Sequence, residues 1–121
     1  MQSNESVGEI GEDLAVSFLK KNGHVVLDRN KRMPGGEIDI VARAPTGELV
    51  FVEVKTLADE SAGRLSPEDE VSSAKLTKMR RVAGLYANAN SKLVREDRGW
   101  RIDVIAVVLT DPPKIRHYEN V

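Results

Sequence analysis

Charged side chains interrupt two short apolar segments, and this pattern limits the possible fold more than any other feature of the chain. The first segment, residues 36–41, carries Glu37 and Asp39, and the second, residues 49–55, carries Glu53 and Lys55. Both segments have the length and apolar content of β-strands. Buried strands rarely hold charged side chains unless these are paired or bind a metal ion. The pattern therefore predicts a site that compensates the charges, and a divalent cation would do so.

The remaining composition is that of an ordinary globular domain. The 121 residues suffice for a single domain, 1–121, of which 40% are hydrophobic and 31% charged. The 18 basic and 19 acidic residues nearly cancel, so we expect no strong non-specific binding of nucleic acid, although a local basic patch remains compatible with this balance. The chain has no cysteine, which excludes disulfides and thiolate metal sites. With no apolar run of ~20 residues and a polar N-terminus, we expect a cytoplasmic protein without a membrane partner.

Hydrophobic periodicity and turn signals predict the element order αβββαββ. A first helix, capped by Ser3 or Asn4, is expected to end near Asn22. A second helix is expected from Ser72 or Ser73 to about Ala89. Strands are expected at 24–29, in the two segments above, at 100–109 and at 115–118, and a loop at 58–70 with a helical turn at 66–69. This order predicts an α/β sandwich, in which helices flank a mixed central sheet and the strand at 100–109 is interior.

The turn between the two charged segments determines which of their residues face each other. A three-residue loop at 45–47, with its final glycine in the left-handed conformation, is a common hairpin connection. In the resulting register Asp39 lies opposite Glu53, and Glu37 lies opposite Lys55, with Cβ atoms ~5 Å apart. Two carboxylates this close repel each other unless a cation lies between them. A register shifted by one residue would place Asp39 on the other face and dismantle the site.

This arrangement of two acids and a lysine suits phosphodiester cleavage. Carboxylate oxygens are preferred ligands of Mg²⁺ and Mn²⁺, and such an ion polarises a phosphodiester and lowers the pKa of a bound water. Lys55 could orient that water or stabilise charge in the transition state. Glu12, on the first helix, is a candidate fourth member, because the small residues Gly8, Gly11 and Ala15 would let the helix approach the sheet closely.

The same residues carry a resemblance to a known superfamily. An aspartate followed by Glu-x-Lys on a hairpin, and preceded by a helical glutamate, resembles the restriction-endonuclease-like (PD-(D/E)xK) nucleases. The closer match is to the YraN-type family of small bacterial proteins, which are similar to archaeal Holliday junction resolvases. The matching motifs span almost the full chain and are Gly8-x-x-Gly11-Glu12-x-x-Ala15, Gly36-Glu37-Ile38-Asp39, Phe51-Val52-Glu53-Val54-Lys55, Val71-x-x-x-Lys75 and Arg101-Ile102-Asp103-Val104.

The resemblance implies a restriction-endonuclease-like fold and a nuclease site at Glu12, Asp39, Glu53 and Lys55, with the Val54 carbonyl as a further metal ligand. The sequence departs from the pattern in one place. Leu57 stands where many members of the family are expected to carry a basic residue shortly after Glu-x-Lys. The departure weakens the expectation of a phosphate contact there and leaves the expected metal site unchanged.

The leading interpretation is a Mg²⁺- or Mn²⁺-dependent nuclease acting on DNA, with branched or structured DNA among the expected substrates. A first alternative is a noncatalytic nucleic-acid-binding or adaptor module that retains the nuclease fold. A second alternative is a purely structural ion-pair cluster of Asp39, Glu53 and Lys55. The similarity to resolvases also implies a weak or DNA-dependent homodimer, because symmetric cutting of a branched duplex needs two active sites.

The roles of several further residues remain open at the level of sequence. Lys75 borders the apolar stripe of the second helix, so it could pack its stem structurally or point toward a phosphate. Lys78 and Arg81 belong to a basic cluster that forms either a solvated helix face or a DNA contact. Glu37 is either a metal ligand or only a cross-strand partner of Lys55. Asp103 interrupts an apolar strand and is expected to form a structural ion pair.

Overall fold

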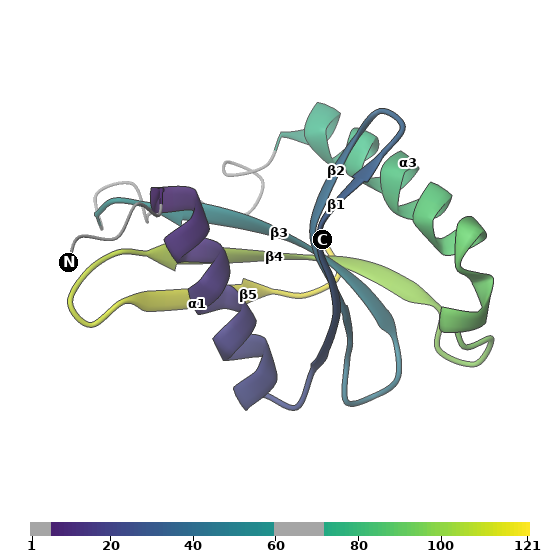
Figure 1. The fold of residues 1–121 in the computed structure, drawn as a ribbon, viewed down its shortest axis with the longest axis horizontal. Coiled ribbons are helices and arrows are strands. Elements are labelled where there is room, and N and C mark those ends of the chain that lie inside the picture. The colour runs from purple at the N-terminus through teal and green to yellow at the C-terminus, as the bar shows by residue number, and fades with distance from the viewer. Residues whose placement is uncertain (1–5, 60–71) are drawn as a thin grey trace.

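The computed structural model describes residues 6–59 and 72–121, and these form one five-stranded sheet between two helices (Figure 1). The strand order is β1-β2-β3-β4-β5, and every neighbouring pair is antiparallel except β3–β4, which is parallel. The elements are α1 (Val7–Lys21), β1 (Val25–Met33), β2 (Gly36–Arg43), β3 (Leu49–Leu57), α3 (Ser73–Ala89), the short 3₁₀ helix η2 (Ser91–Leu93), β4 (Trp100–Val108) and β5 (Lys114–Tyr118). The predicted mixed α/β architecture, its order αβββαββ and the interior place of β4 are confirmed.

Serine side chains cap both helices. Ser6 Oγ accepts a hydrogen bond from the Glu9 N–H at 3.2 Å, and Ser72 Oγ accepts one from the Lys75 N–H at 3.2 Å. The second cap was predicted. The cap of the first helix was placed too early, because Ser6 caps α1 and the predicted residues 3 and 4 lie outside the described residues. The predicted helical turn at 66–69 also lies outside them. Gly23, at φ +82°, follows the end of α1 as expected for a left-handed residue after a helix.

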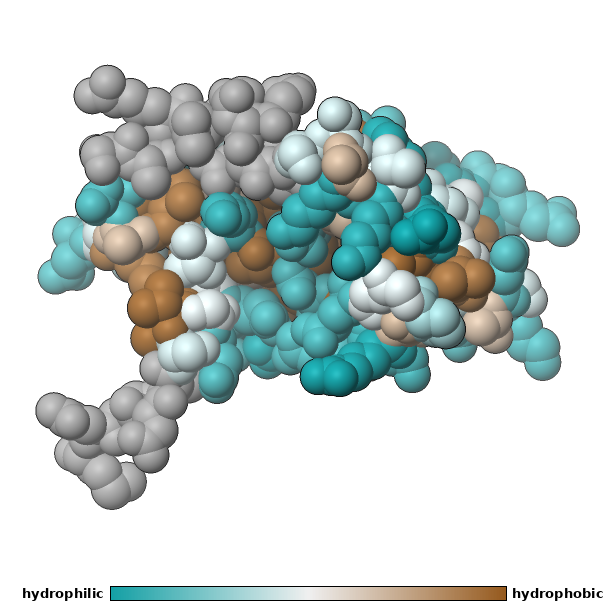
Figure 2. Space-filling view, turned by 90° about the horizontal axis from the view of Figure 1, so that it is seen from above, coloured by the Kyte–Doolittle hydropathy of each residue, from teal (hydrophilic) through white to brown (hydrophobic). Residues whose placement is uncertain are grey.

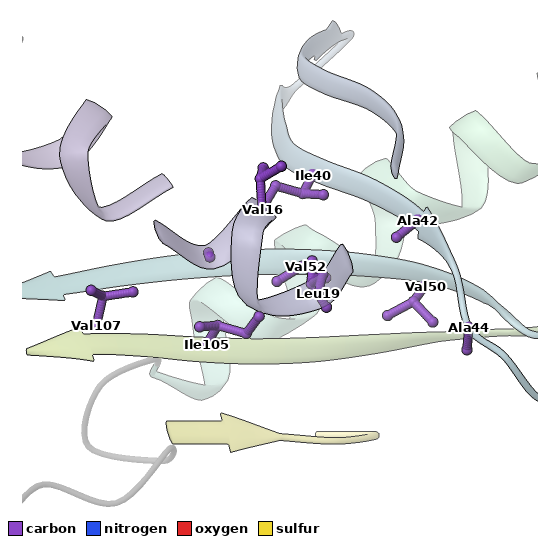
Figure 3. Packing of buried hydrophobic residues seen from close by; sticks show 10 residues of the cluster. Val16, Leu19, Ile40, Ala42, Ala44, Val50, Val52, Ile105 and Val107 are labelled. Atoms are coloured by element: carbon purple, nitrogen blue, oxygen red, sulfur yellow. The ribbon is translucent and has the colours of Figure 1, made fainter. Parts of the chain in front are cut away.

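The two helices cover opposite faces of the sheet, each over its own hydrophobic cluster. Figure 3 shows Val16 and Leu19 of α1 lying over Ile40 and Val52, and this cluster continues to Ile105. The other cluster joins α3 to the opposite face and includes Val41, Leu49, Phe51, Val82, Ala83 and Tyr86. Alternation along β3 explains the division, because successive side chains of a strand point to opposite faces.

β2 and β3 pair in the predicted register, but only over half of β2. The ladder runs from Arg43–Leu49 to Ile40–Val52. Beyond Ile40, β2 pairs only with β1, while β3 continues beside β4 as far as Leu57. The β1–β2 hairpin rises away from the rest of the sheet and lies beside α3 (Figure 1). The two central strands therefore part at one end, and this opening holds the candidate site.

The predicted pairing of Glu37 with Lys55 is wrong. Glu37 lies opposite Arg32 of β1 and forms an ion pair with it at 3.8 Å. The physical reason is the length of β1, which continues to Met33 instead of ending at residue 29 as predicted. The longer strand gives residues 36–38 a partner in β1, and this part of β2 leaves β3. A register shift between Val26 and Asp28 interrupts the same β1–β2 ladder. Within 6–59 and 72–121, neither helix has the length and apolar character needed to cross a membrane.

Candidate active site

Two carboxylates meet where β2 and β3 part. Asp39 comes from β2 and Glu53 from β3, and both line a cavity of about 510 Å³ that also reaches α3. Asp39 Oδ2 accepts a hydrogen bond from the Val54 N–H at 2.9 Å. The carboxylate thus takes the place of a backbone partner for Val54, just beyond the end of the ladder. The predicted placement of the two acids on one side of the sheet agrees with this geometry.

The environment of Asp39 disfavours its charged form. Burial, followed by the negative charge of Glu53, raises the pKa of Asp39 from 3.8 to about 7, and the hydrogen bond from Val54 opposes this only in part. The charge of Glu12 adds a smaller contribution in the same direction. Near neutral pH, a proton or another cation is therefore needed to neutralise the acid pair.

Lys75 reaches the acid pair from α3. Its Nζ lies 2.9 Å from Glu53 Oε1, and the hydrogen bond to Glu53 raises the pKa of Lys75 above its usual range despite partial burial. About half of the side chain remains exposed, at 49%. The sequence left open whether Lys75 packs its stem structurally or points toward a phosphate. Its contact with Glu53 favours a place in the site. Lys75 places a permanent positive charge beside Glu53 and toward solvent.

Glu12 approaches the site from the opposite face of the sheet. A Cβ on Gly11 would overlap the Thr56 side chain, with Thr56 Cβ at 2.9 Å, so α1 packs against β3 as closely as a glycine allows. This agrees with the predicted role of the small residue. The Glu12 side chain is only 16% exposed, and Arg29 lies 3.7 Å from its Oε1, too far for a hydrogen bond. Within the described residues this buried oxygen has no hydrogen-bond partner.

Lys55 lies outside this group. It follows Glu53 by two residues on β3 but is exposed, does not line the cavity, and forms no ion pair with any residue in the described ranges. Lys78 of α3 is better placed, because it lines the cavity. Arg81 of the same helix lies beside the β1–β2 turn, with its guanidinium 4.0 Å from where a Cβ on Gly35 would be. Figure 2 shows that the surface over α3 and the β1–β2 hairpin is largely hydrophilic.

The residues present fit a divalent cation in part. Asp39 and Glu53 offer oxygen ligands in a partly buried position, and Glu12 adds a buried carboxylate oxygen without a hydrogen bond among the described residues. Across 6–59 and 72–121, however, no three acidic or histidine side chains are grouped closely enough to hold an ion by themselves. This donor set suits Mg²⁺ or Mn²⁺, which usually binds one or two carboxylates and completes its shell with water and substrate phosphate.

A second charged cluster is buried on the α1 face of the sheet. Asp103 has no exposed surface and accepts hydrogen bonds from Arg101 Nε at 3.0 Å and the Asn120 N–H at 2.9 Å, and its Oδ2 lies 2.7 Å from His117 Nε2. The predicted structural role of Asp103 agrees with this network, but sequence reasoning missed His117. The two residues are fourteen positions apart and meet only through the β4–β5 pairing.

The fold and the site together define a small α/β domain with a paired-carboxylate site at the opening between two central strands. The model of the Uncharacterised protein family UPF0102 matches residues 11–107, and the chain belongs to this family, which is the YraN-type family that its motifs resemble.

Three proteins named UPF0102 protein illustrate the relationship. The chain is 33% identical to one from Dictyoglomus thermophilum over 97% of its own length and 94% of the relative. It is 44% identical to one from Pelobacter propionicus, with 97% and 82% covered. It is 42% identical to one from Alkaliphilus oremlandii, with 97% of each chain covered. The family thus extends over almost the whole chain.

Proposed function

We propose that the protein is a Mg²⁺- or Mn²⁺-dependent nuclease that hydrolyses phosphodiester bonds in DNA. The observation that carries the proposal is the pairing of the Asp39 and Glu53 carboxylates in a cavity beside a lysine. Burial and the neighbouring acid raise the pKa of Asp39 to about 7, so the pair favours a bound cation. Perturbed carboxylates in a cleft are typical of functional sites. The resemblance to PD-(D/E)xK nucleases supports the same reaction class.

Different residues of the chain would have different roles in this reaction. Asp39 and Glu53 would hold the ion, with Glu12 and the Val54 carbonyl as further ligands. A bound ion would polarise the phosphodiester and make a water more acidic. That water would give up a proton to solvent and form a new oxygen–phosphorus bond as the bond from phosphorus to the leaving sugar oxygen breaks, and the leaving oxygen would take a proton from solvent. Lys75 would stabilise the negative charge that builds up on the phosphate oxygens.

Two lysines compete for the role that the family pattern gives to Lys55. Lys55 occupies the matching position in the sequence, whereas Lys75 is the one whose ammonium lies 2.9 Å from Glu53. Lys55→Met and Lys75→Met should therefore be compared for cleavage under single-turnover conditions. We expect Lys75→Met to reduce the cleavage rate by about a hundredfold to a thousandfold, the usual effect of removing one stabilising donor. A larger loss in Lys55→Met would assign the role to Lys55 instead.

The contact between Lys75 and Glu53 also favours a second candidate function, a DNA-binding module without turnover. In such a module the ammonium would neutralise Glu53 permanently, and no metal ion would be required. The exposed Lys78 and Arg81 on the same helix would contact phosphates in either case.

The two candidates differ in their response to manganese. The purified protein is incubated with linear, single-stranded and four-way DNA in the presence of Mn²⁺. Each sample is run on a native gel, which shows retarded complexes, and on a denaturing gel, which shows cleavage products. A nuclease should cut at least one substrate, and Glu53→Gln should abolish cutting. Glu9→Gln is the matched control, since Glu9 lies exposed in the first turn of α1 and away from the cavity. Retarded but uncut DNA, unaffected by Glu53→Gln, would support the binding module and refute the nuclease.

A further inference from the structure

The cavity beside the acid pair has an apolar wall that phosphate chemistry alone does not explain. Asp39, Glu53 and Lys75 are among the residues that line it. The rest of its lining is mainly apolar and includes Ile38, Phe51, Ala74, Met79, Val82 and Ala83. A phosphodiester and its water shell need charged and polar neighbours, so this wall suits a different part of a substrate. Its volume of about 510 Å³ falls within the range of about 300–1,000 Å³ typical of small-molecule sites.

The opening of the strands also exposes a backbone edge to this cavity. Four consecutive residues of β2, 36–39, line it, which a flat strand could not achieve because its side chains alternate between faces. In the described part of the chain, residues 36–38 pair with β1 on one side, and none of the four has a ladder with β3 on the other. The β3-facing edge of β2 therefore presents peptide groups that can exchange hydrogen bonds with a ligand.

An apolar wall facing a polar edge matches the chemistry of a nucleobase. A base has two apolar faces and a rim of hydrogen-bond donors and acceptors, and enzymes that unstack a base hold it between apolar side chains while they read its rim. Met79 and Ile38 can contact the faces, and the edge of β2 can meet the rim. Lys75 and Lys78 are both placed along the cavity to hold the flanking phosphates.

We infer that this cavity receives one unstacked nucleobase next to the phosphate held at the acid pair. The inference rests on the proposed function, since that phosphate is the one to be cleaved. It specifies the substrate class as DNA in which a nucleotide is unpaired or easily unpaired, such as a bulge, a branch point or a single strand. In a continuous duplex, the base that enters the cavity would first have to leave the stack, which costs a few kcal/mol.

Ala74 offers a way to fill the cavity without disturbing the core. It is exposed in the first turn of α3 and lines the cavity, so Ala74→Trp should place a large side chain where the base would lie. Ala89→Trp is the matched control, because Ala89 is exposed at the other end of the same helix and does not line the cavity. Met79→Ala is a second test variant, which removes a wall residue instead of blocking the space.

Binding is measured with the full chain in Ca²⁺, a cation chosen to occupy the site without supporting cleavage. The probes are a duplex with a single bulged 2-aminopurine and the same duplex fully paired. The wild type should bind the bulged probe about tenfold more tightly, as expected for one base held by an apolar wall, and the 2-aminopurine emission should rise as the base leaves the stack. Ala74→Trp should lose both effects, Met79→Ala should weaken the preference several-fold, and Ala89→Trp should keep it.

Cleavage in Mn²⁺, measured on the same two duplexes, separates this inference from the proposed function. Equal binding of both probes by the wild type, or a preference that survives in Ala74→Trp and Met79→Ala, would overturn the base pocket. If the protein then still cut both duplexes, the nuclease function would stand without the pocket. A bulge preference that Ala74→Trp abolishes, in a protein that cuts neither duplex, would support the pocket and refute hydrolysis.

Discussion

Asp39 Oδ2 accepts a hydrogen bond from the Val54 backbone N–H at 2.9 Å, just beyond the last β2–β3 ladder pair, Ile40–Val52. A side chain of one strand thereby satisfies a backbone group of the other at the point where the two separate. The bond also holds the carboxylate close enough to Glu53 for their charges to interact. The same contact thus satisfies a backbone group at the end of the ladder and positions Asp39 in the candidate site.

Replacing Asp39 with asparagine should stabilise the metal-free protein at pH 8. The asparagine oxygen can still accept the Val54 hydrogen bond, but it carries no charge. Burial and Glu53 raise the pKa of Asp39 from 3.8 to about 7, so the folded state holds this proton more tightly than the unfolded state. Stability contributed by the protonated acid is therefore lost as the pH rises from about 4 to about 7. Between pH 5 and pH 8, the free energy of unfolding measured with urea should fall by on the order of 2 kcal/mol more in wild type than in the variant.

Binding of Mn²⁺ should weaken below pH 7. The ion must displace the proton of Asp39, whose pKa is raised to about 7, because only the ionised carboxylate is a good ligand. The affinity should fall by up to about tenfold per pH unit below this value and be level above it. Calorimetric titrations between pH 5.5 and 8 would measure the slope. Affinity that does not change over this range in wild type would argue against a metal ligand at Asp39.

Adding a methyl group at Gly11 should destabilise the protein and disturb the site. The new Cβ would overlap the Thr56 side chain, so Gly11→Ala should cost about 1–3 kcal/mol and push Glu12 away from Asp39. Gly84→Ala is the matched control, because a Cβ there has nothing within 4 Å outside its own helix. This control should gain about 0.5–1 kcal/mol from the better helix propensity of alanine. Urea unfolding of both variants gives the comparison, and a gain in stability for Gly11→Ala would disprove the close contact.

Removing the charge network at Asp103 should be among the most damaging single changes. Asp103→Ala leaves Arg101 and His117 without their shared partner in a buried position, and broken buried pairs cost about 3–5 kcal/mol. Burial alone would raise the pKa of Asp103, but the hydrogen bonds from His117, Arg101 and Asn120 prevail and lower it. The network therefore stabilises the fold above about pH 4 and loses this effect as the pH falls through the lowered pKa. On acidification, the Asp103→Ala variant should unfold at a higher pH than wild type. Asp97→Ala, at an exposed position, should unfold at the same pH as wild type.

His24 and His117 should respond in opposite directions to replacement by phenylalanine. His24 is buried, with 8% exposed, and neither of its ring nitrogens has a hydrogen-bond partner among the described residues. An apolar ring of similar size removes this cost, so His24→Phe should gain about 1 kcal/mol. His117→Phe should instead lose stability, because it breaks the 2.7 Å contact with Asp103. Thermal unfolding at pH 7 would compare them, and a loss for His24→Phe would indicate a partner for its imidazole.

Sequence reasoning succeeded where the determinants are local. The loop at 45–47 fixed the β2–β3 register, because Gly47 adopts the positive φ of +105° that this hairpin needs. The cap at Ser72 and the end of α1 at Gly23 follow from backbone groups that a helix end must satisfy. The meeting of Asp39 and Glu53 follows from the same register.

The remaining features depend on contacts between distant segments. β1 was predicted four residues too short, because residues 30–32 are polar, and only the pairing of Lys31, Arg32 and Met33 with β2 makes this segment a strand. The parting of β2 from β3 depends on that pairing. The position of Lys75 beside Glu53 depends on how α3 packs across the sheet. Neither of these spatial relationships leaves a periodic signal in the sequence.

The register shift in β1 has a consequence for how the molecule behaves in a crowded solution. β1 is an outer strand of the sheet, nine residues long, and Val25 and Leu27 on it are exposed. A regular apolar strand in this position would invite edge-to-edge aggregation. The irregularity at Val26–Asp28 disrupts the regular spacing of the peptide groups along the outer edge of β1. The cationic residues that follow it repel the same edge of a second molecule. The strand that opens the site therefore also protects the protein from polymerising through its own sheet.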